Sequence, residues 1–314
     1  MTDVVITEFM DAAAVSLLAG RFRIHYDPEL AEKPRLLAGF AAEARALVVR
    51  NRTQVRGPLL EGAEKLACVG RLGVGLDNID TEACAARGIA VYPATGANDV
   101  AVAEYVVAAV LMLLRRAYGA SAEVVAGDWP RERLIGREAA GKVLGLVGFG
   151  AIARETARRA AALGMEVVAH DPFVEADDPA WELAKSLTLN EVLMRSDALS
   201  LHVPLSPATR HLIGPEQVAL IKPGAVLVNA ARGGVLDQAA LVEGLRGGVL
   251  SGAALDVFET EPLTAAAAAR FEGLSNVILT PHIAGLTEES NVRVSQLVAE
   301  QVIAHLEGLE CRKG

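Results

Sequence analysis

The stretch KVLGLVGFGAIARETA, residues 142–157, decides the fold of this chain. Its first residues form an aliphatic run typical of a buried strand, and its last residues have the spacing of a helix. Between them lies the pattern Gly148-x-Gly150-x-x-Ala153. On both sides of this stretch, short apolar runs alternate with helical patterns along the chain. This alternation predicts an α/β fold with two Rossmann-like parallel sheets that carry helices on their faces.

The glycine-rich turn indicates a nucleotide cofactor. Gly148 permits a tight turn, Gly150 lets the backbone approach a pyrophosphate, and the small Ala153 lets the helix pack closely on the strand. The next apolar run, MEVVAHDPF, ends at Asp171, 21 positions after Gly150. A carboxylate there is placed to accept hydrogen bonds from ribose hydroxyls and would repel a 2′-phosphate, which predicts NAD. Asp171 could instead be a turn residue before Pro172, but its spacing favours the cofactor interpretation.

Composition excludes several classes of protein. The chain has 314 residues, 52% of them hydrophobic, 22% charged and 4% aromatic, so its length allows two domains with aliphatic cores. A formal net charge of -9 and the lack of a basic run argue against a nucleic-acid surface. The acidic N-terminus predicts no signal peptide, and the apolar residues 100–114 include Glu104 and are too few to span a membrane.

The cysteines point to a reducing compartment. Cys68, Cys84 and Cys311 lie far apart in the sequence and form no CxxC pair. This spacing predicts neither a disulfide nor a metal site, and it favours a cytoplasmic location.

The glycine turn lies in the middle of the chain, so its domain interrupts another one. We predict an NAD-binding domain over residues 98–284 and a substrate domain made of residues 1–97 and 285–314. The chain crosses between them near residues 96–100 and 284–288, which are the predicted hinge. The last segment has a continuous helical period, with Thr287 as its predicted N-cap.

Polar side chains follow three predicted strands of the second half. VLVNAARGGVLD places Arg232 after an apolar run, with two glycines that keep the loop close. AALDVFETEP places Asp256, Glu259 and Glu261 after the next run, and NVILTPHIAG places His282 after the last. Each has an ordinary explanation alone, as a surface arginine, a solvated acidic run and a packed histidine. Because ligands bind outside the carboxyl ends of parallel strands, their joint placement favours one catalytic group.

At this point the motifs resemble, in order and along essentially the whole chain, those of the D-isomer-specific 2-hydroxyacid dehydrogenases. The matching stretches are GRLGVGLDNID, VAEYVV, GLVGFGAIA, LHVPLSPATRHLI, VNAARGGVLD, ALDVFETEP and TPHIAG. The resemblance implies an inserted NAD domain, a discontinuous flavodoxin-like substrate domain that closes with it around substrate, and a catalytic trio. It also implies a homodimer through the NAD domain, using the apolar helix at residues 100–114.

The resemblance further assigns individual positions. The catalytic trio it implies is Arg232, Glu261 and His282, and it places Asp256 on the nicotinamide carboxamide. The residues it implies at NAD are Gly148, Gly150, Ala151, Ile152, Asp171, His202, Val203, Pro204, Ala230, Ala231, Arg232, Asp256, His282 and Gly285.

These residue types suit hydride transfer between a 2-hydroxy acid and a 2-keto acid. His282, as imidazolium, can give a proton to the carbonyl oxygen and recover it in oxidation. Glu261 is expected to bind the other ring nitrogen and to favour the protonated ring. Arg232 is expected to pair with the substrate carboxylate and polarise the carbonyl. The N–H groups of Val74 and Gly75, in a Gly-rich loop, are expected to hold the carboxylate as well.

The stretch VVRNRTQV indicates which acid is bound. Arg50 ends a predicted strand and is the candidate for a second anion on the substrate, with Asn51 beside it, whereas Arg52 is equally well explained by solvation. ITEFMD, RNRTQV, RLGVGLDNID, AHDPF and PHIAGLTEESN most resemble the (S)-sulfolactate dehydrogenase branch of the family. That resemblance implies oxidation of (S)-3-sulfolactate to 3-sulfopyruvate.

Three alternatives stay open from the sequence. Two are enzymes of the same family, a D-3-phosphoglycerate dehydrogenase and a glyoxylate/hydroxypyruvate reductase, which keep every catalytic assignment. The third is an NAD-sensing corepressor, because such proteins resemble these dehydrogenases down to the trio. Corepressors typically add disordered tails, whereas this chain has a globular composition throughout.

Overall fold

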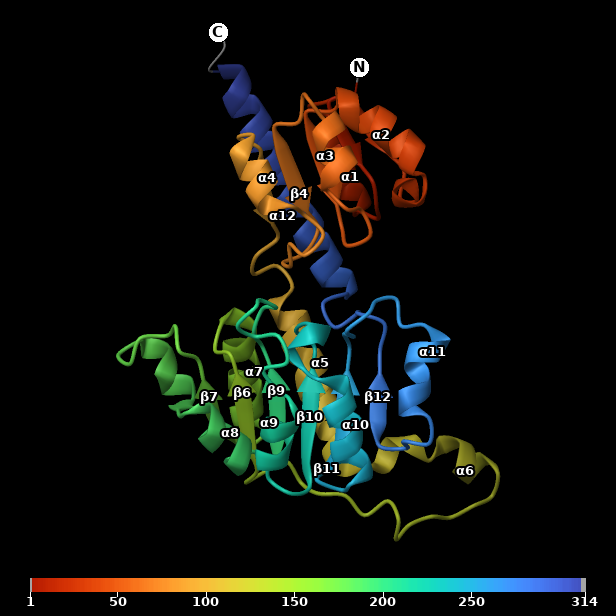
Figure 1. Ribbon diagram of the computed structural model, residues 1–314, viewed down its shortest axis with the longest axis vertical. Coiled ribbons are helices and arrows are strands. Elements are labelled where there is room, and N and C mark those ends of the chain that lie inside the picture. Colours follow the sequence, from red (N-terminus) through yellow and green to blue (C-terminus); the bar gives the residue numbers. More distant parts are fainter. Residues whose placement is uncertain (1, 312–314) are drawn as a thin grey trace. The chain divides into compact units, whose positions relative to one another are not determined.

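The computed structural model describes residues 2–311. The chain forms two compact units, one made of residues 1–98 with residues 286–314 and the other of residues 99–285 (Figure 1). At both crossings the boundary lies one residue beyond the position predicted from the sequence.

The first unit is built on a five-stranded parallel sheet with the order β2-β1-β3-β4-β5, the flavodoxin-like order. Alternate residues of its strands face opposite sides: Ala46 and Val48 join one core, and Leu47 and Val49 join the other. The aliphatic runs of the sequence are therefore strands buried on both faces, as predicted. The strands are β1 (Val4–Ile6), β2 (Ile24–Tyr26), β3 (Ala46–Val49), β4 (Cys68–Arg71) and β5 (Ala90–Pro93).

The C-terminal helix α12 (Glu288–Cys311) completes this unit. It packs on β4 at Gly70, where an added Cβ would come within 2.5 Å of Val298, so that only glycine allows this approach. The predicted N-cap is confirmed, because the Thr287 hydroxyl accepts a hydrogen bond from the N–H of Ser290 at 3.0 Å. The other helices are α1 (Ala12–Ala19), η1 (Leu30–Glu32), α2 (Pro34–Glu43), α3 (Gly57–Gly62) and α4 (Thr81–Ala86).

The second unit contains a seven-stranded parallel sheet with the order β12-β11-β10-β9-β6-β7-β8. Counted from β6, this is the order of a dinucleotide-binding sheet, whose topological switch point lies between β6 and β9. The strands are β6 (Val143–Val147), β7 (Glu166–His170), β8 (Lys185–Ser186), β9 (Ala198–Leu201), β10 (Ala225–Asn229), β11 (Leu250–Leu255) and β12 (Val277–Leu279).

Helices cover both faces of this sheet (Figure 1). Residues of α5 and α7 contribute to the core on one face, and residues of α8, α9 and α10 to the core on the other. The two-sheet α/β prediction is confirmed. The helices of this unit are α5 (Asp99–Arg115), η2 (Ala117–Gly119), α6 (Ser121–Val125), α7 (Ala151–Ala162), η3 (Pro179–Leu183), α8 (Leu189–Arg195), α9 (Pro215–Leu220), η4 (Gly233–Val235), α10 (Gln238–Arg246), α11 (Ala265–Ala268) and η5 (Ala269–Phe271).

The long apolar helix α5 lies largely inside its own unit. Its buried residues include Val102, Val106, Val110 and Leu114, which pack against the sheet and α7. Across residues 2–311, no helix combines the length and the apolar character that crossing a membrane requires.

Candidate active site

The glycine turn lies at the switch point of the second sheet. Gly148 has φ 92°, and an added Cβ would lie 2.7 Å from the carbonyl oxygen of His202, so both conformation and space require glycine there. Gly150 is the N-cap of α7, and an added Cβ would meet nothing within 4 Å. The turn is therefore tightly held at Gly148 and open at Gly150, as backbone that receives a pyrophosphate must be.

Asp171 lies beside this turn. Its Oδ2 accepts a hydrogen bond from the N–H of Phe149 at 2.7 Å, and its Oδ1 accepts one from the N–H of Phe173 at 2.9 Å. A carboxylate has about four acceptor positions, so each oxygen keeps capacity for a ribose hydroxyl. The glycine turn and Asp171 therefore fit a bound NAD, and Asp171 also fixes the turn that would hold the pyrophosphate.

His202 follows β9 and turns a buried ring nitrogen, Nε2, into this region. Burial lowers the pKa of its imidazole to about 4, so the ring is neutral at ordinary pH. Within residues 2–311, its buried Nε2 has no hydrogen-bond partner. Val203 and Pro204 follow it after β9, and an added Cβ at Gly148 would also lie 2.9 Å from Val203.

Arg232 follows β10 on a loop that side chains and glycine hold in place. Asn229 fixes this loop, because its Oδ1 accepts from the N–H of Ala231 at 3.1 Å and its Nδ2 donates to the Arg232 carbonyl at 3.0 Å. An added Cβ on Gly233 would lie 1.9 Å from the backbone of Phe258, which follows β11. Glycine therefore brings the loops after β10 and β11 into contact, and with them Arg232 and the acidic segment.

His282 and Glu261 meet across two strand ends. Nδ1 of His282 lies 2.7 Å from Oε2 of Glu261, and the other oxygen of Glu261 accepts a hydrogen bond from the N–H of Phe258 at 2.9 Å. Burial opposes ionisation of Glu261, but the hydrogen bonds from His282 and Phe258 and the charges of His282 and Arg232 outweigh it and lower its pKa. Glu261 is therefore an anion that binds the ring of His282 through Nδ1 and not through Nε2.

Asp256 holds the segment that carries His282. Its Oδ1 accepts hydrogen bonds from the Thr280 hydroxyl at 2.6 Å and the Ile283 N–H at 2.8 Å, and its Oδ2 accepts one from the Ala284 N–H at 2.8 Å. His282 itself has φ 58°, a left-handed conformation that a side chain adopts only where its surroundings fix it. Asp256 supplies that restraint.

Two supports of this segment carry no signal in the sequence. Thr280 and Tyr105 share a hydrogen bond of 2.6 Å between their hydroxyl oxygens, which ties α5 to the His282 segment. Tyr105 reads in the sequence as one more residue of an apolar helix. Its partner is 175 positions away, so only the fold brings the two together.

The acidic run after β11 has divided roles. Glu259 accepts a hydrogen bond from the N–H of Gln238 at 3.1 Å, and it lies 3.4 Å from His211 and 3.7 Å from Arg270. It therefore supports neighbouring loops, and Glu261 is the member of the run that binds His282.

The remaining residues predicted at NAD lie along the same edge of this sheet. Ala151 and Ile152 begin α7, Ala230 and Ala231 follow β10, and Gly285 ends the segment after β12. All belong to carboxyl ends of parallel strands or to the helix start beside them, where open α/β sheets bind ligands.

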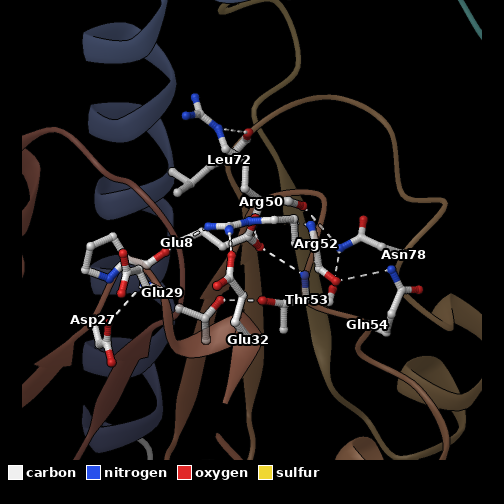
Figure 2. Close-up of polar contacts among 12 residues, drawn as sticks. Glu8, Asp27, Glu29, Glu32, Arg50, Arg52, Thr53, Gln54, Leu72 and Asn78 are labelled. Carbon is white, nitrogen blue, oxygen red and sulfur yellow. Dashed lines mark hydrogen bonds and ion pairs between the residues drawn. The ribbon is translucent and has the colours of Figure 1, made fainter. Parts of the chain in front are cut away.

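In the first unit, the two arginines of the loop after β3 have different partners (Figure 2). Arg52 places its Nε 3.4 Å from Glu8, its Nη1 2.6 Å from Glu32, and its Nη2 2.9 Å from the carbonyl of Pro28. Its charge is therefore already paired, which gives Arg52 a structural role that the sequence left undecided.

Arg50 has neutral partners instead. Its Nη2 donates to Oδ1 of Asn291 at 2.5 Å, its Nε donates to the carbonyl of Leu72 at 3.4 Å, and its guanidinium lies 5.8 Å from the centre of the Phe9 ring. Among residues 2–311, no carboxylate forms an ion pair with it. Burial lowers the pKa of Arg50, and the charge of Glu8 opposes that effect. Within the described residues 2–311, Arg50 is therefore a half-buried cation that feels the charge of Glu8 but forms no ion pair with a carboxylate.

The loop after β4 carries the other predicted substrate residues of this unit. Val74 and Gly75 lie in an irregular segment, and no acceptor among residues 2–311 takes their N–H groups. Gly73 has φ 149° and its carbonyl accepts the N–H of Ala94 at 2.9 Å, which anchors the segment on β5. Asn51, beside Arg50, is exposed.

The comparisons with known proteins agree with this geometry. Residues 107–284 match the model of the D-isomer specific 2-hydroxyacid dehydrogenase, NAD binding domain. The chain is 53% identical over 303 residues to an (S)-sulfolactate dehydrogenase of Chromohalobacter salexigens, covering 96% of this chain and 97% of that protein. It is 41% identical over 269 residues to a D-3-phosphoglycerate dehydrogenase of Methanocaldococcus jannaschii, covering 85% of this chain and 50% of that protein.

A solved structure extends the likeness to the whole architecture. A D-lactate dehydrogenase from Aquifex aeolicus, complexed with NAD and lactic acid, has a TM-score of 0.85 and 29% identity to this chain. The match covers 98% of this chain and 96% of that structure. Together with the glycine turn, Asp171 and the His282–Glu261 pair, these matches show that the chain belongs to the D-isomer-specific 2-hydroxyacid dehydrogenase family and is an NAD-dependent oxidoreductase.

Proposed function

We propose that this dehydrogenase interconverts (S)-3-sulfolactate and 3-sulfopyruvate. The observation that carries the proposal is Arg50 at the carboxyl end of β3, a half-buried guanidinium that forms no ion pair with any carboxylate among residues 2–311. A substrate with a second anion would give this guanidinium a direct ion pair, and the planar guanidinium suits a sulfonate with its three oxygens. The (S)-sulfolactate dehydrogenase that is 53% identical to this chain supports the same choice.

We propose catalytic roles for three residues of the second unit. NAD, when bound, accepts the hydride in oxidation and returns it in reduction. His282 holds the proton at Nε2 and exchanges it with the oxygen on the reacting carbon, while Glu261 fixes the ring through Nδ1. Arg232 pairs with the substrate carboxylate and polarises the carbonyl. A general acid in such a place contributes about 10²- to 10⁴-fold to the rate.

The remaining binding roles follow the same chemistry. The N–H groups of Val74 and Gly75 are proposed donors to the substrate carboxylate, because Gly-rich backbone makes an anion nest. Asn51 is proposed as a polar neighbour of Arg50. Asp256 is proposed to reach the nicotinamide carboxamide in addition to holding the segment of His282.

Two other substrates would use the same catalytic residues. Phosphohydroxypyruvate also carries a second anion, and the D-3-phosphoglycerate dehydrogenase relative makes it the first competitor. Glyoxylate and hydroxypyruvate carry only the carboxylate and leave Arg50 without an anion to bind. The order of preference among these acids therefore distinguishes the proposed function from its alternatives.

The direct experiment compares kcat/KM for NADH oxidation with sulfopyruvate, phosphohydroxypyruvate, oxaloacetate and glyoxylate. We expect sulfopyruvate to exceed glyoxylate by about tenfold or more, the value of one charge-assisted hydrogen bond. A higher value for phosphohydroxypyruvate would make the enzyme a phosphoglycerate dehydrogenase. A higher value for glyoxylate would remove the second anion from the account.

We also propose a homodimer through the NAD domain, in a cytoplasmic enzyme. The apolar face of α5 is mostly used inside its own unit, but Val100 and Met112 stay exposed. The segment after α5 adds exposed apolar side chains, notably Val125 at 88% and Trp129 at 75%. Sedimentation of the wild-type chain tests the dimer. A monomer at micromolar concentration would contradict it.

A further inference from the structure

A single buried carboxylate organises the loop that carries Arg50. Glu8 follows β1 and is 2% exposed. Its Oε1 accepts hydrogen bonds from the N–H groups of Arg50 at 2.8 Å and Thr53 at 3.1 Å. Its Oε2 accepts from the N–H of Arg52 at 3.1 Å. Residues 50–53, here named the Arg50 loop, are therefore folded around the negative charge of Glu8.

The opposite side of the Arg50 loop is held by an amide. Nδ2 of Asn78 donates to the carbonyl of Arg50 at 3.1 Å and to that of Thr53 at 2.7 Å, and Asn78 is 5% exposed. The hydroxyl oxygens of Thr7 and Thr53 lie 2.7 Å apart. Figure 2 shows Glu8 and Asn78 on either side of the loop. Both N–H and C=O groups of the loop are thus bound by buried side chains.

The sheet order explains why these groups meet. β1, β3 and β4 are neighbours in the first sheet, so Glu8, the Arg50 loop and Asn78 follow adjacent strands at the same edge. Asn78 also belongs to the segment after β4 that carries Val74 and Gly75. The hydrogen bonds therefore join the two loops to which the proposed function assigns the substrate's anions.

Glu8 binds the two arginines of the loop in different ways. Burial opposes ionisation of Glu8, but the N–H groups of Arg50, Thr53 and Arg52 outweigh it and lower the pKa of Glu8. The guanidinium of Arg52 lies 3.4 Å from the carboxylate of Glu8, whereas Arg50 is bound to Glu8 through its backbone N–H. Hydrogen bonds to an ionised acceptor are about twice as strong as neutral ones, which makes this loop conformation well defined.

We propose that Glu8 is the positioning residue that sets substrate specificity by holding Arg50 where it binds the second anion. This inference rests on the proposed function, because it acts through Arg50. It also explains why a side chain must perform that binding: three N–H groups of the Arg50 loop already bind the carboxylate of Glu8. A substrate anion therefore meets the guanidinium of Arg50 and not the N–H groups of Arg50, Arg52 and Thr53.

The test is a double-mutant cycle between Glu8→Gln and Arg50→Ala. Glutamine keeps the shape of Glu8 but removes its charge and turns an NH₂ group toward N–H donors. We expect Glu8→Gln to raise KM for sulfopyruvate about tenfold, with kcat and the KM for glyoxylate within about twofold of wild type. In the Arg50→Ala background, Glu8→Gln should add less than about twofold, because its effect passes through Arg50.

A matched control changes another carboxylate that contacts Arg52 but accepts no hydrogen bond from the N–H groups of the Arg50 loop. Glu32→Gln removes the exposed partner of Arg52 and leaves every hydrogen bond of Glu8 to the Arg50 loop intact, so it should leave both KM values unchanged. Glu8→Asp keeps the charge but is one methylene shorter, and it should fall between wild type and Glu8→Gln. If Glu8→Gln does not fold, Glu8→Asp takes its place in the cycle.

Amide hydrogen exchange gives a readout that needs no turnover. We expect the amides of residues 50, 52 and 53 to lose protection in Glu8→Gln and to keep it in Glu32→Gln. Equal losses on sulfopyruvate and glyoxylate, additive effects with Arg50→Ala, or unchanged protection would each overturn the positioning role.

Failure of the proposed function is recognised separately. It would show as a wild-type enzyme without preference for doubly charged acids, or as equal losses on both substrates in Arg50→Ala alone. If phosphohydroxypyruvate is the better substrate, it replaces sulfopyruvate in the cycle, and the expected pattern is the same.

Discussion

Nδ1 of His282 lies 2.7 Å from Oε2 of Glu261, although the two residues follow different strands of the second sheet. Glu261 is held by the N–H of Phe258, and the His282 segment is held by Asp256. The ring is therefore fixed from both sides with Nε2 left to act. This arrangement suits a group that must receive and return a proton in one orientation.

Replacing His282 with alanine should remove turnover but not cofactor binding. We expect kcat to fall about 10²- to 10⁴-fold, the contribution of a positioned general acid. The glycine turn and Asp171, which we propose to hold the other end of NAD, are remote from this change in the sequence. The Kd for NADH, measured by fluorescence titration, should therefore stay within about threefold. Turnover like that of the wild type would remove His282 from the mechanism.

The loop of Arg232 depends on a glycine. Gly233→Ala places a Cβ 1.9 Å from the backbone of Phe258, which neither loop can accept without moving. We expect a loss of stability of about 1–3 kcal/mol, as for overpacking, together with a drop of about tenfold or more in kcat/KM. Urea unfolding and steady-state kinetics measure the two effects. Gly119→Ala is the control, because its Cβ would meet nothing within 4 Å, and it should be close to neutral.

Arg52 should matter for stability and not for selectivity. Arg52→Ala removes the contacts to Glu8, Glu32 and the Pro28 carbonyl. We expect the free energy of unfolding to fall by about 1 kcal/mol, since the side chain is partly exposed. The ratio of kcat/KM for sulfopyruvate to that for glyoxylate should be unchanged. Amide hydrogen exchange in β1 and β3 measures this loss of stability. Lys65→Ala, which removes an exposed pair with Glu43, is the control. A lost selectivity with unchanged stability would give Arg52 the role proposed for Arg50.

Burial of His202 should make the second unit sensitive to acid. The pKa of this group is about 4 in the fold and about 6.5 when exposed, so the unfolded chain binds the proton first. Stability should therefore fall as pH decreases from 6.5 to 4, by roughly 3 kcal/mol at the low end. Urea unfolding followed by tryptophan fluorescence reports this unit, because Trp129 and Trp181 are the two tryptophans of the chain. The free energy of unfolding of His202→Asn should change less between pH 6.5 and 4. Identical pH dependence in both proteins would exclude His202 as the cause.

Much of the fold could be predicted because its signals are local. Strands buried on both faces leave continuous aliphatic runs in the sequence. Thr287 indicates the start of the last helix, because its side chain caps that helix. The strand β8 gave no such signal, because Lys185–Ser186 is a two-residue edge strand with exposed side chains. A strand of that kind has no apolar pattern to detect.

The candidate site could be predicted from the sequence where its residues follow strands. Prediction failed where two interacting residues lie far apart in the sequence. Arg232, Glu261 and His282 each end an apolar run, so the parallel-sheet rule brings them together. Glu8 and Arg52 are 44 positions apart; the sequence left the role of Arg52 undecided and gave no signal for Glu8. Only the adjacency of β1 and β3 reveals that Glu8 contacts the guanidinium of Arg52 and the backbone of Arg50.

The most direct test of the central claim is the ratio of kcat/KM for sulfopyruvate to that for glyoxylate, measured in the wild type and in Arg50→Ala. We predict a large ratio in the wild type that falls about tenfold or more in the variant, because only sulfopyruvate loses an ionic hydrogen bond. Equal losses on both acids would contradict the account, since Arg50 would then serve the enzyme without recognising a second anion.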